Sequence, residues 1–498
     1  MDLHPASGQL FMDPLSGTVR IKTAASMLGV TAQTVRNWVA SGQIPSVRHP
    51  LNGYRLFRVK DIEQLLVGSG SVANPRDSGT LSPVGPVLAY SQAEGRGYRA
   101  VTLRDGQTVT TEVPSNRTAI EYQERDFERD WLRSPIRPAS ASGRTRVRIG
   151  DIFSGGGIFS LGVDEALRAV GLQPEHAFGI DFDRDAIETF GWNFAESVAL
   201  HSDITSITSG AVGAHRSLSE RDFLRSAGEG VDILVAGPPC QGHSDLNNHT
   251  RRDDPKNSLY FSVARMAELL QPSFVLIENV PGVVHDRSFV VQRTAEALDN
   301  LGYHISSKLV DMTCIGVPQT RRRFVLVASR KGRVDLDAAL ALQADDARPV
   351  SWAIDDLTDR YSADATYESS ASHSTENRRR IDYLFDHELH ELPNSERPPC
   401  HRDKPHSYVS VYGRMWWDRP APTITGGFGS TGQGRFVHPL FRRTLTPHEA
   451  CRLQFVPDFF TFPDGVGRRS MQQIIGNAAP PKLSQTVILG AAIQGVLL

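Results

Sequence analysis

An apolar run, Val147-Arg-Ile-Gly-Asp-Ile-Phe153, leads directly into Ser154-Gly155-Gly156-Gly157. An apolar strand that ends in glycines and continues into a helical stretch is typical of a sheet whose ligands bind at the carboxyl ends of its strands. Glycine lets the backbone come close to a ligand at the N-terminus of the following helix. Tight packing needs the same kind of turn, so this stretch alone leaves ligand binding and packing equally open.

Apolar strands alternate with helical stretches as far as about Ser329, and several strands end in polar residues. The strand Ala177-Phe-Gly-Ile-Asp181 ends in an acid followed by the ring of Phe182, and His201-Ser-Asp203-Ile204 supplies another acid. An acid at such a strand end suits ribose hydroxyl groups, and a neighbouring ring can stack on adenine. These strand ends predict a nucleoside site at one edge of an α/β sheet with helices on both faces.

Two further strands deliver reactive side chains to the same edge. Val231-Asp-Ile-Leu-Val-Ala-Gly237 leads into Pro238-Pro239-Cys240-Gln241, and Phe274-Val-Leu-Ile-Glu278 ends in a carboxylate. A lone cysteine is usually a small core residue, but one that follows Gly-Pro-Pro at a strand end is displayed there. Glu278 is expected to face Cys240 across adjacent strand ends, although a carboxylate in such a place also caps helices or pairs with arginines.

An arginine-rich stretch, Val317-Pro-Gln319-Thr-Arg321-Arg-Arg323, precedes the strand from Phe324 to Ala328. Three consecutive arginines are more often a solvated surface patch. Alternate positions entering a strand lie on one face, however, so Arg321 and Arg323 are expected side by side.

The ordered set of motifs resembles that of the cytosine-5 DNA methyltransferases. The motifs are Asp151-Ile-Phe-Ser-Gly155, Gly237-Pro-Pro-Cys-Gln241, Glu278-Asn-Val280, Gln319-x-Arg-x-Arg323, Leu445-Thr-Pro-His-Glu-Ala-Cys-Arg-Leu-Gln454 and Gln473-Ile-Ile-Gly-Asn-Ala-Ala-Pro-Pro481. The resemblance covers about Val147 to Leu498 and departs from the family pattern at Ile158 and His243. It implies the Rossmann-like doubly wound α/β sheet of class I methyltransferases. The catalytic domain would occupy 147–330 and 441–498, with a target-recognition domain inserted at 331–440.

The resemblance also implies an activity and assigns residues to it. The chain would transfer a methyl group from S-adenosylmethionine to C5 of cytosine in a specific double-stranded DNA sequence, with the base flipped out of the helix. Cys240 would attack C6, Arg321 would favour its thiolate, Glu278 would share a proton with N3, and Arg323 would hold O2. The cofactor would lie against Phe153, Gly155, Gly157, Asp181, Phe182, Asp203, Ile204, Pro239 and Asn477.

DNA contacts are expected outside the catalytic motifs as well. The polar stretch from Gln241 to Leu259 would close over the flipped base, with Arg251 and Arg252 on phosphates. In the insert, basic residues are candidates for phosphate or guanine contacts: Arg378, Arg379, Arg380, Arg402, Lys404 and Arg414.

A separate module precedes these motifs. Between Thr18 and Lys60 there are seven Lys or Arg and no Asp or Glu, an excess of positive charge that attracts phosphates. Two short helical stretches meet at Gly29, and Asn52-Gly53 separates two strand-like runs as in a hairpin. Residues 18–67 resemble the winged helix-turn-helix of MerR-type regulators and excisionases, which implies DNA contacts by Arg36, Asn37, Arg48 and Arg55. An ordinary small helical domain is the alternative.

Composition limits the remaining possibilities. The chain is 40% hydrophobic and 22% charged, with a net charge of −2, as expected of a globular protein. It has no apolar run of about eighteen residues and no secretory signal, so we expect it in the cytoplasm, on the nucleoid when bound to DNA, and not in a membrane. The four cysteines form no Cys-x-x-Cys pair, and no metal is expected. Residues 1–17 are expected to be a tail, and 68–146 a linker with a small region of unknown role.

Two other functions stay open at this point. One is an RNA cytosine-5 methyltransferase on the same scaffold, which the helix-turn-helix and the long insert disfavour because RNA is read by other surfaces. The other is a DNA-binding regulator with an inert methyltransferase scaffold, which the intact Cys, Glu and Arg set disfavours. A cognate restriction endonuclease would be the partner in a restriction-modification system, whereas an orphan enzyme would have none.

Overall fold

The computed structural model describes residues 18–20, 35, 39, 44–48, 55–58, 87–117, 121–138, 145–228, 230–239, 259–285, 289–402 and 411–498. The chain divides into two compact units, Met1–Ser82 and Pro83–Leu498.

The first unit contains a three-stranded antiparallel sheet in the order β1 (Thr18–Arg20), β3 (Arg55–Arg58) and β2 (Val47–Arg48). The antiparallel pairing of β2 with β3 confirms the predicted strands on either side of Asn52-Gly53. β1 is not among the expected elements, because three residues are too few to show a strand period. The buried apolar residues described in this unit are Val35, Ile44 and Phe57.

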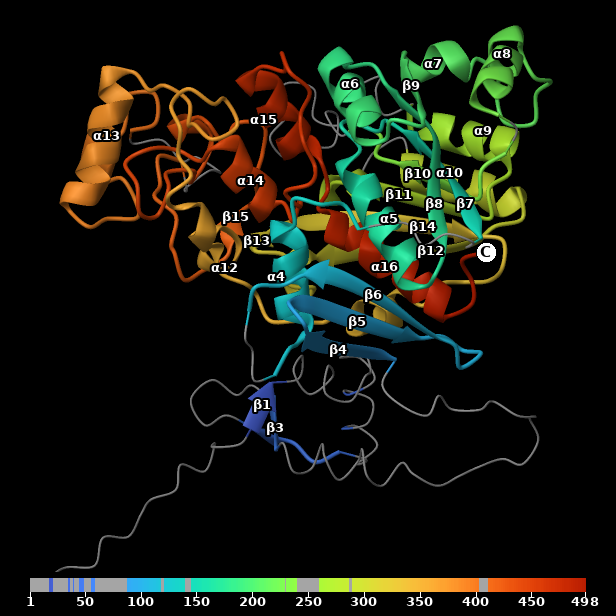
Figure 1. Ribbon diagram of the computed structural model, residues 1–498, viewed down its shortest axis with the longest axis horizontal. Helices are drawn as coiled ribbons and strands as arrows, with labels where there is room; N and C mark the ends of the chain where they lie inside the picture. The colour runs from blue at the N-terminus through green and yellow to red at the C-terminus, as the bar shows by residue number, and fades with distance from the viewer. Residues whose placement is uncertain are drawn as a thin grey trace, which may run out of the picture. The chain divides into compact units, whose positions relative to one another are not determined.

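A seven-stranded sheet forms the centre of the second unit (Figure 1). Its order is β12 (His304–Asp311), β14 (Arg322–Ser329), β11 (Phe274–Asn279), β10 (Ile233–Ala236), β7 (Arg146–Ile152), β8 (Gln173–Asp181) and β9 (Val198–His201). The strands from β11 to β9 pair in parallel. This sheet confirms the predicted doubly wound α/β class.

Helices cover both faces of this sheet, and successive side chains of a strand pack alternately against the two helical layers. On β10, Ile233 and Val235 join one apolar cluster, whereas Leu234 and Ala236 join the other. The first cluster includes residues of α5 (Ile158–Ala169), α6 (Arg184–Asn193) and α16 (Pro481–Ile493). The second includes residues of α7 (Ile204–Ile207), α8 (Leu218–Ala227), α9 (Tyr260–Leu270) and α10 (Val290–Asn300). Strands buried on both faces explain why the sequence shows near-continuous apolar runs.

One strand runs against the expected direction. β14 pairs antiparallel with both β11 and β12, so the sheet is not purely parallel as its alternation of strands and helices predicts. The connection from β12 to β14 contains only η3 (Met312–Cys314) and β13 (Gln319–Thr320), with no crossover helix to return the chain. β14 therefore begins at the edge where β11 ends, and Asn279 pairs with Phe324.

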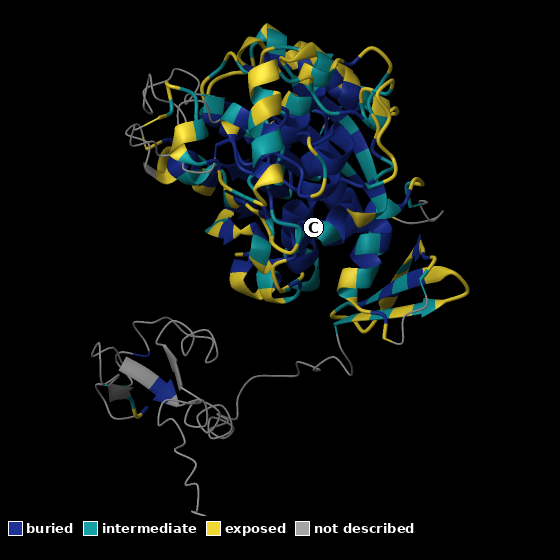
Figure 2. Ribbon diagram, turned by 90° about the vertical axis from the view of Figure 1, so that its left-hand side faces the viewer, coloured by how far each residue is buried: buried dark blue, intermediate teal, exposed yellow. Residues whose placement is uncertain are grey.

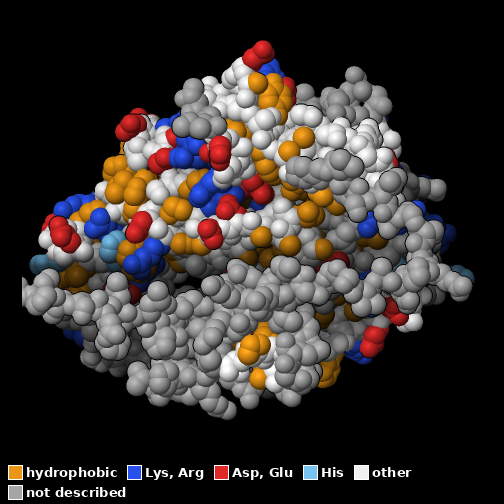
Figure 3. All heavy atoms as spheres, turned by 90° about the horizontal axis from the view of Figure 1, so that it is seen from below, with side chains coloured by type: hydrophobic (Ala, Val, Ile, Leu, Met, Phe, Trp, Pro, Cys, Tyr) orange, Lys and Arg blue, Asp and Glu red, His pale blue; other side chains and the backbone are white. Residues whose placement is uncertain are grey.

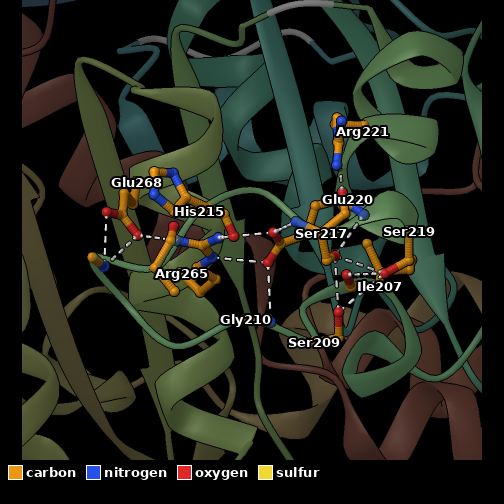
Figure 4. Close-up of polar contacts among 12 residues, drawn as sticks. Ile207, Ser209, Gly210, His215, Ser217, Ser219, Glu220, Arg221, Arg265 and Glu268 are labelled. Atoms are coloured by element: carbon orange, nitrogen blue, oxygen red, sulfur yellow. Dashed lines mark hydrogen bonds and ion pairs between the residues drawn. The ribbon is translucent and has the colours of Figure 1, made fainter.

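A buried arginine fixes α9 in place (Figure 4). Arg265 pairs with Glu220 of α8 at 2.7 Å and with Glu268 at 2.6 Å, and it donates to the carbonyl of Ala214 at 3.0 Å. The hydrogen bond from Arg265 lowers the pKa of Glu220 to about 2. These contacts anchor the helix that follows the segment 240–258.

A small antiparallel sheet and one helix precede the central sheet, and two strands of the small sheet contact α5 (Figure 1). The sheet is β4 (Leu88–Ala93), β5 (Arg96–Thr102) and β6 (Thr108–Pro114), and the helix is α4 (Glu124–Arg133). Burial alternates along its strands (Figure 2), as in β5, where Gly97, Arg99 and Val101 are buried. The expected boundary at residue 147 therefore does not separate two compact units.

α4 supplies carboxylates to cations buried in the rest of the unit. Glu128 pairs with Lys482 of α16 and, at 2.5 Å, with Arg348, and both cations are completely buried. Lys482 also donates to Glu124 at 3.0 Å. Burial alone would raise the pKa of Glu128, but the charges of Lys482 and Arg348 outweigh it and lower that pKa. Residues 121–138 are thus tied to the rest of the second unit by buried ion pairs.

The inserted region begins with helices that pack on the catalytic core. α11 (Leu336–Ala341) contacts α16, and α12 (Val350–Ile354) contacts α14 (Pro447–Leu453). A separate apolar cluster farther along includes Ile381 and Leu384 of α13 (Thr375–Asp386), with Val411 and Val437. The other elements are η2 (Pro281–His285), η4 (Asp355–Leu357), η5 (Asn394–Glu396), β15 (Ala421–Pro422), η6 (Thr431–Gln433) and α15 (Arg468–Asn477). Helices within the expected insert at 331–440 therefore contact helices outside it, and the bounds of the insert stay a prediction.

The described surface and helices lack the features that a membrane span or a metal site would need. On the face shown in Figure 3, acidic and basic side chains are interspersed among apolar ones. Among the described residues, no helix is long and apolar enough to cross a membrane, and no group of three or more His, Cys, Asp or Glu is arranged to hold a metal ion.

A buried histidine joins the insert to the returning catalytic segment. His448 of α14 lies 2.8 Å from Glu368 through Nδ1 and 2.9 Å from Asp458 through Nε2. Burial lowers the pKa of His448, but the hydrogen bonds to Asp458 and Glu368 outweigh it, and the pKa is raised. Burial raises the pKa of Asp458, but hydrogen bonds from His448 and Arg452 bring it down to about 2. The raised pKa favours the imidazolium form of His448, in which both ring nitrogens donate.

Replacing Glu128 with Gln should destabilise the protein by about 3–5 kcal/mol, because Lys482 and Arg348 would each lose a buried counter-charge. Urea unfolding followed by circular dichroism measures this change. The matched control is Glu121→Gln at an exposed position, which should shift the unfolding free energy by less than about 0.5 kcal/mol. Equal stability of the two variants would contradict the structural role of α4.

Replacing His448 with Gln should cost about 1–3 kcal/mol of unfolding free energy near pH 6, because a charged donor is lost. Since the pKa of His448 is raised on folding, its contribution is complete below about pH 6.5, the ordinary histidine value, and fades as pH rises through the folded pKa. The contribution of Asp458 has the opposite sign and is lost as pH falls from about 4 toward 2. Unfolding free energies at a series of pH values, with exposed His304→Gln as control, measure the effect. A difference that grows with pH would refute it.

Candidate active site

A cavity of about 720 Å³ opens at the carboxyl edge of β7, β8, β10 and β11. It is closed on the other side by residues of the insert and of α15, including Thr425, Gly426 and Asn477. Eight of the residues predicted from sequence line it: Phe153, Gly155, Asp181, Phe182, Pro239, Glu278, Arg323 and Asn477. The reason they meet is that parallel strands bring their carboxyl ends to one edge, and the reversed β14 brings its beginning there.

The turn after β7 forms one end of the cavity. Gly155 has a φ of 53°, and a Cβ placed on it would meet nothing within 4 Å. Its N–H donates to the carboxylate of Asp181 at 2.8 Å, and a second oxygen of Asp181 accepts from the N–H of Asp183 at 2.9 Å. Burial raises the pKa of Asp181, against the hydrogen bonds from these two N–H groups. Beside it, the ring of Phe182 is 62% exposed although it belongs to a strand end.

Three residues predicted to touch a cofactor do not line the cavity. Gly157 has a φ of 82°, and a Cβ there would lie 2.4 Å from the ring of Phe194, so this glycine is required for packing. Asp203 caps α7 by accepting from the N–H of Thr205 at 2.9 Å. Ile204 is buried in the apolar cluster under α9. Strand-end position identifies such residues, but it does not distinguish those that turn toward the cavity.

The other end of the cavity carries an ion pair. Nε of Arg323 lies 2.5 Å from Oε1 of Glu278, and both side chains are about nine-tenths buried. Next to it, Asn279 donates from its amide to the carbonyl of Pro238 at 3.3 Å and accepts from the N–H of Val280 at 2.7 Å. Asn279 thus holds the Pro238-Pro239 turn against β11, a role that reading the sequence did not assign to it.

Arg321 does not lie beside Arg323. It falls between β13 and β14, is buried, and does not line the cavity. Its guanidinium donates to the carbonyls of Ile424 at 2.7 Å and Ala478 at 2.7 Å. The expectation that Arg321 and Arg323 share one face is therefore wrong, because the break between the two strands interrupts the alternation on which it relied.

Asp151 is a further acid of the cavity, and the sequence did not mark it as a site residue. It is almost completely buried at the end of β7 and accepts from the hydroxyl of Ser160 at 2.7 Å. Burial raises its pKa to about 7, against the hydrogen bond from Ser160. Its position in the motif Asp151-Ile-Phe-Ser-Gly155 is the feature of the sequence that could have identified it as a site residue.

Several predicted residues lie outside the described part of the chain. These are Cys240, the stretch that follows it with Arg251 and Arg252, Lys404, and Arg36 and Asn37. Arg48 and Arg55 are described only as paired strand positions in β2 and β3. Pro239, directly before Cys240, lines the cavity.

Most of the predicted basic residues of the insert that are described contact the insert itself. Arg380 donates to the carbonyl of Glu396 at 3.2 Å, Arg402 to that of Ser395 at 2.8 Å, and Arg414 to that of Pro439 at 2.6 Å. Arg379 pairs with Glu396 at 3.4 Å. These contacts hold the loops of the insert around α13. A guanidinium group that also binds DNA would have to keep its contact within the insert.

Comparison with known proteins gives matches for both parts of the chain. Residues 147–491 match the C-5 cytosine-specific DNA methylase family, and residues 20–57 match the MerR family of regulatory proteins. The chain is 46% identical over 398 residues to the Type II methyltransferase M1.BsuMI of Bacillus subtilis (strain 168), which covers 78% of this chain and 92% of that protein. It is 28% identical over 348 residues to the Type II methyltransferase M1.HphI of Haemophilus parahaemolyticus, with 68% and 84% covered.

Proposed function

Because this chain belongs to the C-5 cytosine-specific DNA methylase family, we propose that one end of its cavity binds S-adenosylmethionine and the other binds a cytosine flipped out of duplex DNA. The protein is a DNA cytosine-5 methyltransferase. The observation that supports the assignment of the two ends is that Asp181 and Asn477 line the same cavity as the Glu278–Arg323 pair.

The residues at the β7–β8 end fit the cofactor. The open space at Gly155 admits a ligand close to the backbone, the carboxylate of Asp181 suits ribose hydroxyl groups, and the exposed ring of Phe182 suits adenine. When bound, S-adenosylmethionine supplies a methyl group activated by its positively charged sulfur. We assign its binding to the predicted residues that line this end: Phe153, Gly155, Asp181, Phe182, Pro239 and Asn477.

The residues at the β11–β14 end prepare the cytosine to accept a methyl group. C5 of cytosine is a weak nucleophile, and addition of the Cys240 thiolate to C6 places an electron pair on the ring. A proton shared between Glu278 and N3 stabilises that charge, and Arg323 holds O2 while it orients Glu278 through their ion pair. After methylation, loss of the C5 proton restores the C5–C6 double bond and expels the thiolate.

Arg321 takes a different part in this scheme from the one that the sequence suggests. Its guanidinium is engaged with backbone carbonyls of the insert and of the end of α15. We therefore assign it a positioning role behind the wall of the cavity and not a contact with Cys240.

The N-terminal unit is proposed to bind DNA as well. Its MerR-family match, its excess of positive charge and its β2–β3 pairing support contacts by Arg36, Asn37, Arg48 and Arg55. Such contacts would either add a second foothold on the substrate or occupy a promoter.

We also propose that a restriction endonuclease with the same target accompanies the enzyme, since M1.BsuMI and M1.HphI are both named Type II methyltransferases. Genomic DNA from cells that make this protein should then resist that endonuclease, and bisulfite sequencing of the same DNA would identify the protected cytosines.

Replacing Cys240 with Ser should abolish transfer of labelled methyl groups to duplex DNA, because a serine hydroxyl is not ionised near neutral pH. The exposed Cys314→Ser is the matched control and should keep full activity. Duplex DNA with 5-fluorocytosine should leave a covalent adduct on Cys240, because the fluorine cannot leave as the proton does. Full activity of C240S, or transfer to transfer RNA in place of DNA, would overturn the proposed function.

Replacing Glu278 with Gln should lower the rate of methyl transfer by about 10²–10⁴-fold, because the amide cannot give up a proton to N3. Single-turnover measurements with saturating cofactor isolate this step. Cofactor affinity should stay within about twofold of wild type, since Glu278 lies at the other end of the cavity. A loss of cofactor affinity without a loss of rate would contradict the division of the cavity into two ends.

Deleting residues 1–82 removes the first compact unit and should weaken DNA binding while methyl transfer at saturating DNA is kept. The slope of log affinity against log salt should become shallower by about 0.9 for each phosphate contact that is lost. Fluorescence anisotropy at several salt concentrations measures both quantities. An unchanged slope would show that this unit makes no phosphate contacts in the complex.

A further inference from the structure

Three buried side chains form a polar cluster behind the wall of the cavity, which we call the Gln319–Arg321–Gln454 cluster. Their exposed fractions are 0%, 1% and 0%, so none of them can reach DNA or cofactor. They come from the segment before β14 and from the end of α14. Any influence on binding must therefore pass through the segments to which they are hydrogen-bonded.

Gln319 connects the insert to α14. Its amide donates to the carbonyl of Leu453 at 2.8 Å and to the side-chain oxygen of Gln454 at 2.6 Å. The side-chain oxygen Oε1 of Gln319 accepts from the N–H of Ile424 at 3.1 Å. Ile424 follows β15, where the insert returns toward the catalytic core and pairs with β13.

Arg321 and Gln454 extend the same cluster to the end of α15. Arg321 donates to the carbonyl of Ile424 at 2.7 Å, of Ala478 at 2.7 Å and of Gly476 at 3.3 Å. Gln454 donates to the carbonyls of Ile475 at 2.6 Å and Ala478 at 3.1 Å. Both backbone polar groups of Ile424 are therefore held by the same cluster that holds the segment 475–478.

The two segments that the cluster joins are also in direct contact and both line the cavity. A Cβ on Gly476 would lie 2.0 Å from the nitrogen of Gly426 and 2.2 Å from the carbonyl carbon of Thr425. Thr425 and Gly426 line the cavity from the insert, and Gly476 and Asn477 line it from α15. Neither segment can shift by an ångström without moving the other or breaking hydrogen bonds in the interior, where unpaired polar groups are costly.

We propose that the Gln319–Arg321–Gln454 cluster couples cofactor binding to DNA binding, by fixing the return of the insert against the segment that carries Asn477. Its members are positioning residues, and the inference rests on the proposed binding of cofactor near Asn477 and of DNA by the insert. A ligand that orders one segment orders the other through the cluster, so the second ligand binds to a wall that is already in place. The coupling must be reciprocal, because it is an equilibrium property of the two sites.

The test compares cofactor affinity with and without DNA in the full chain. The dissociation constant of S-adenosylhomocysteine is measured by calorimetry alone and with saturating sheared genomic DNA, which contains every short target sequence. We expect DNA to tighten binding by about tenfold in wild type, within the usual range of coupling between sites. The ratio of the dissociation constant without DNA to that with DNA measures the coupling. In Arg321→Lys and in Gln454→Met this ratio should fall to within about twofold of one, because each variant loses hydrogen bonds to the segment 475–478. Arg333→Lys, at an exposed position, should keep the wild-type ratio.

Each outcome decides the proposal. If DNA leaves the dissociation constant of S-adenosylhomocysteine unchanged in wild type, the proposed coupling is overturned whatever the variants do. A ratio that stays at the wild-type value in both variants, even with weaker affinity for each ligand, also overturns it and leaves the cluster a purely structural role. If wild type methylates no cytosine but shows the coupling and its loss in the variants, the proposed function fails while the coupling stands.

Discussion

The reversed direction of β14 is the constraint on which the rest of the site depends. Because β14 starts where β11 ends, its first residues lie beside Glu278, and Arg323 can form its ion pair there. The residues just before the strand are forced beneath the returning insert, where Gln319 and Arg321 find backbone partners. A parallel strand at this position would have sent the same residues to the opposite edge of the sheet. The direction of one strand thus determines both the chemistry at the cavity and the way in which the insert is attached.

The structure also changes the view of the segment before the central sheet. The sequence indicates a linker followed by a small region of unknown role, and the structure gives that region a role, because α4 provides the carboxylates that neutralise Lys482 and Arg348. Arg133 of the same helix pairs with Asp356 at 3.0 Å, and Arg452 of α14 lies 3.2 Å from that residue. The helix therefore contacts the core and the start of the insert together. Buried cations with their counter-charges in one short helix make that helix indispensable to the fold.

Much of the fold and of the cavity could be predicted, because the local signals were strong. Apolar runs ending in Gly155, Asp181 and Glu278 identify strands and the edge that they share, and the order of the motifs identifies the family. What could not be predicted depends on three-dimensional relations. The direction of β14, the inward turn of Arg321 and the position of Asp203 away from the cavity depend on the path of loops, which residue type does not encode. The acids of α4 were missed because their partners lie far along the chain, and pairing at such distances leaves no local pattern.

The contact between Glu124 and Lys482 joins residues 358 positions apart in sequence. At a translation rate of about 5–20 residues per second, the acids of α4 leave the ribosome roughly 20–70 seconds before their cation is made. During that interval the ion pairs of Glu124 and Glu128 with Lys482 cannot form. The nascent polypeptide therefore cannot complete this part of its core until α16 has emerged, so a product that stops before α16 would expose the apolar surface that α16 normally covers and become a substrate for chaperones or proteases.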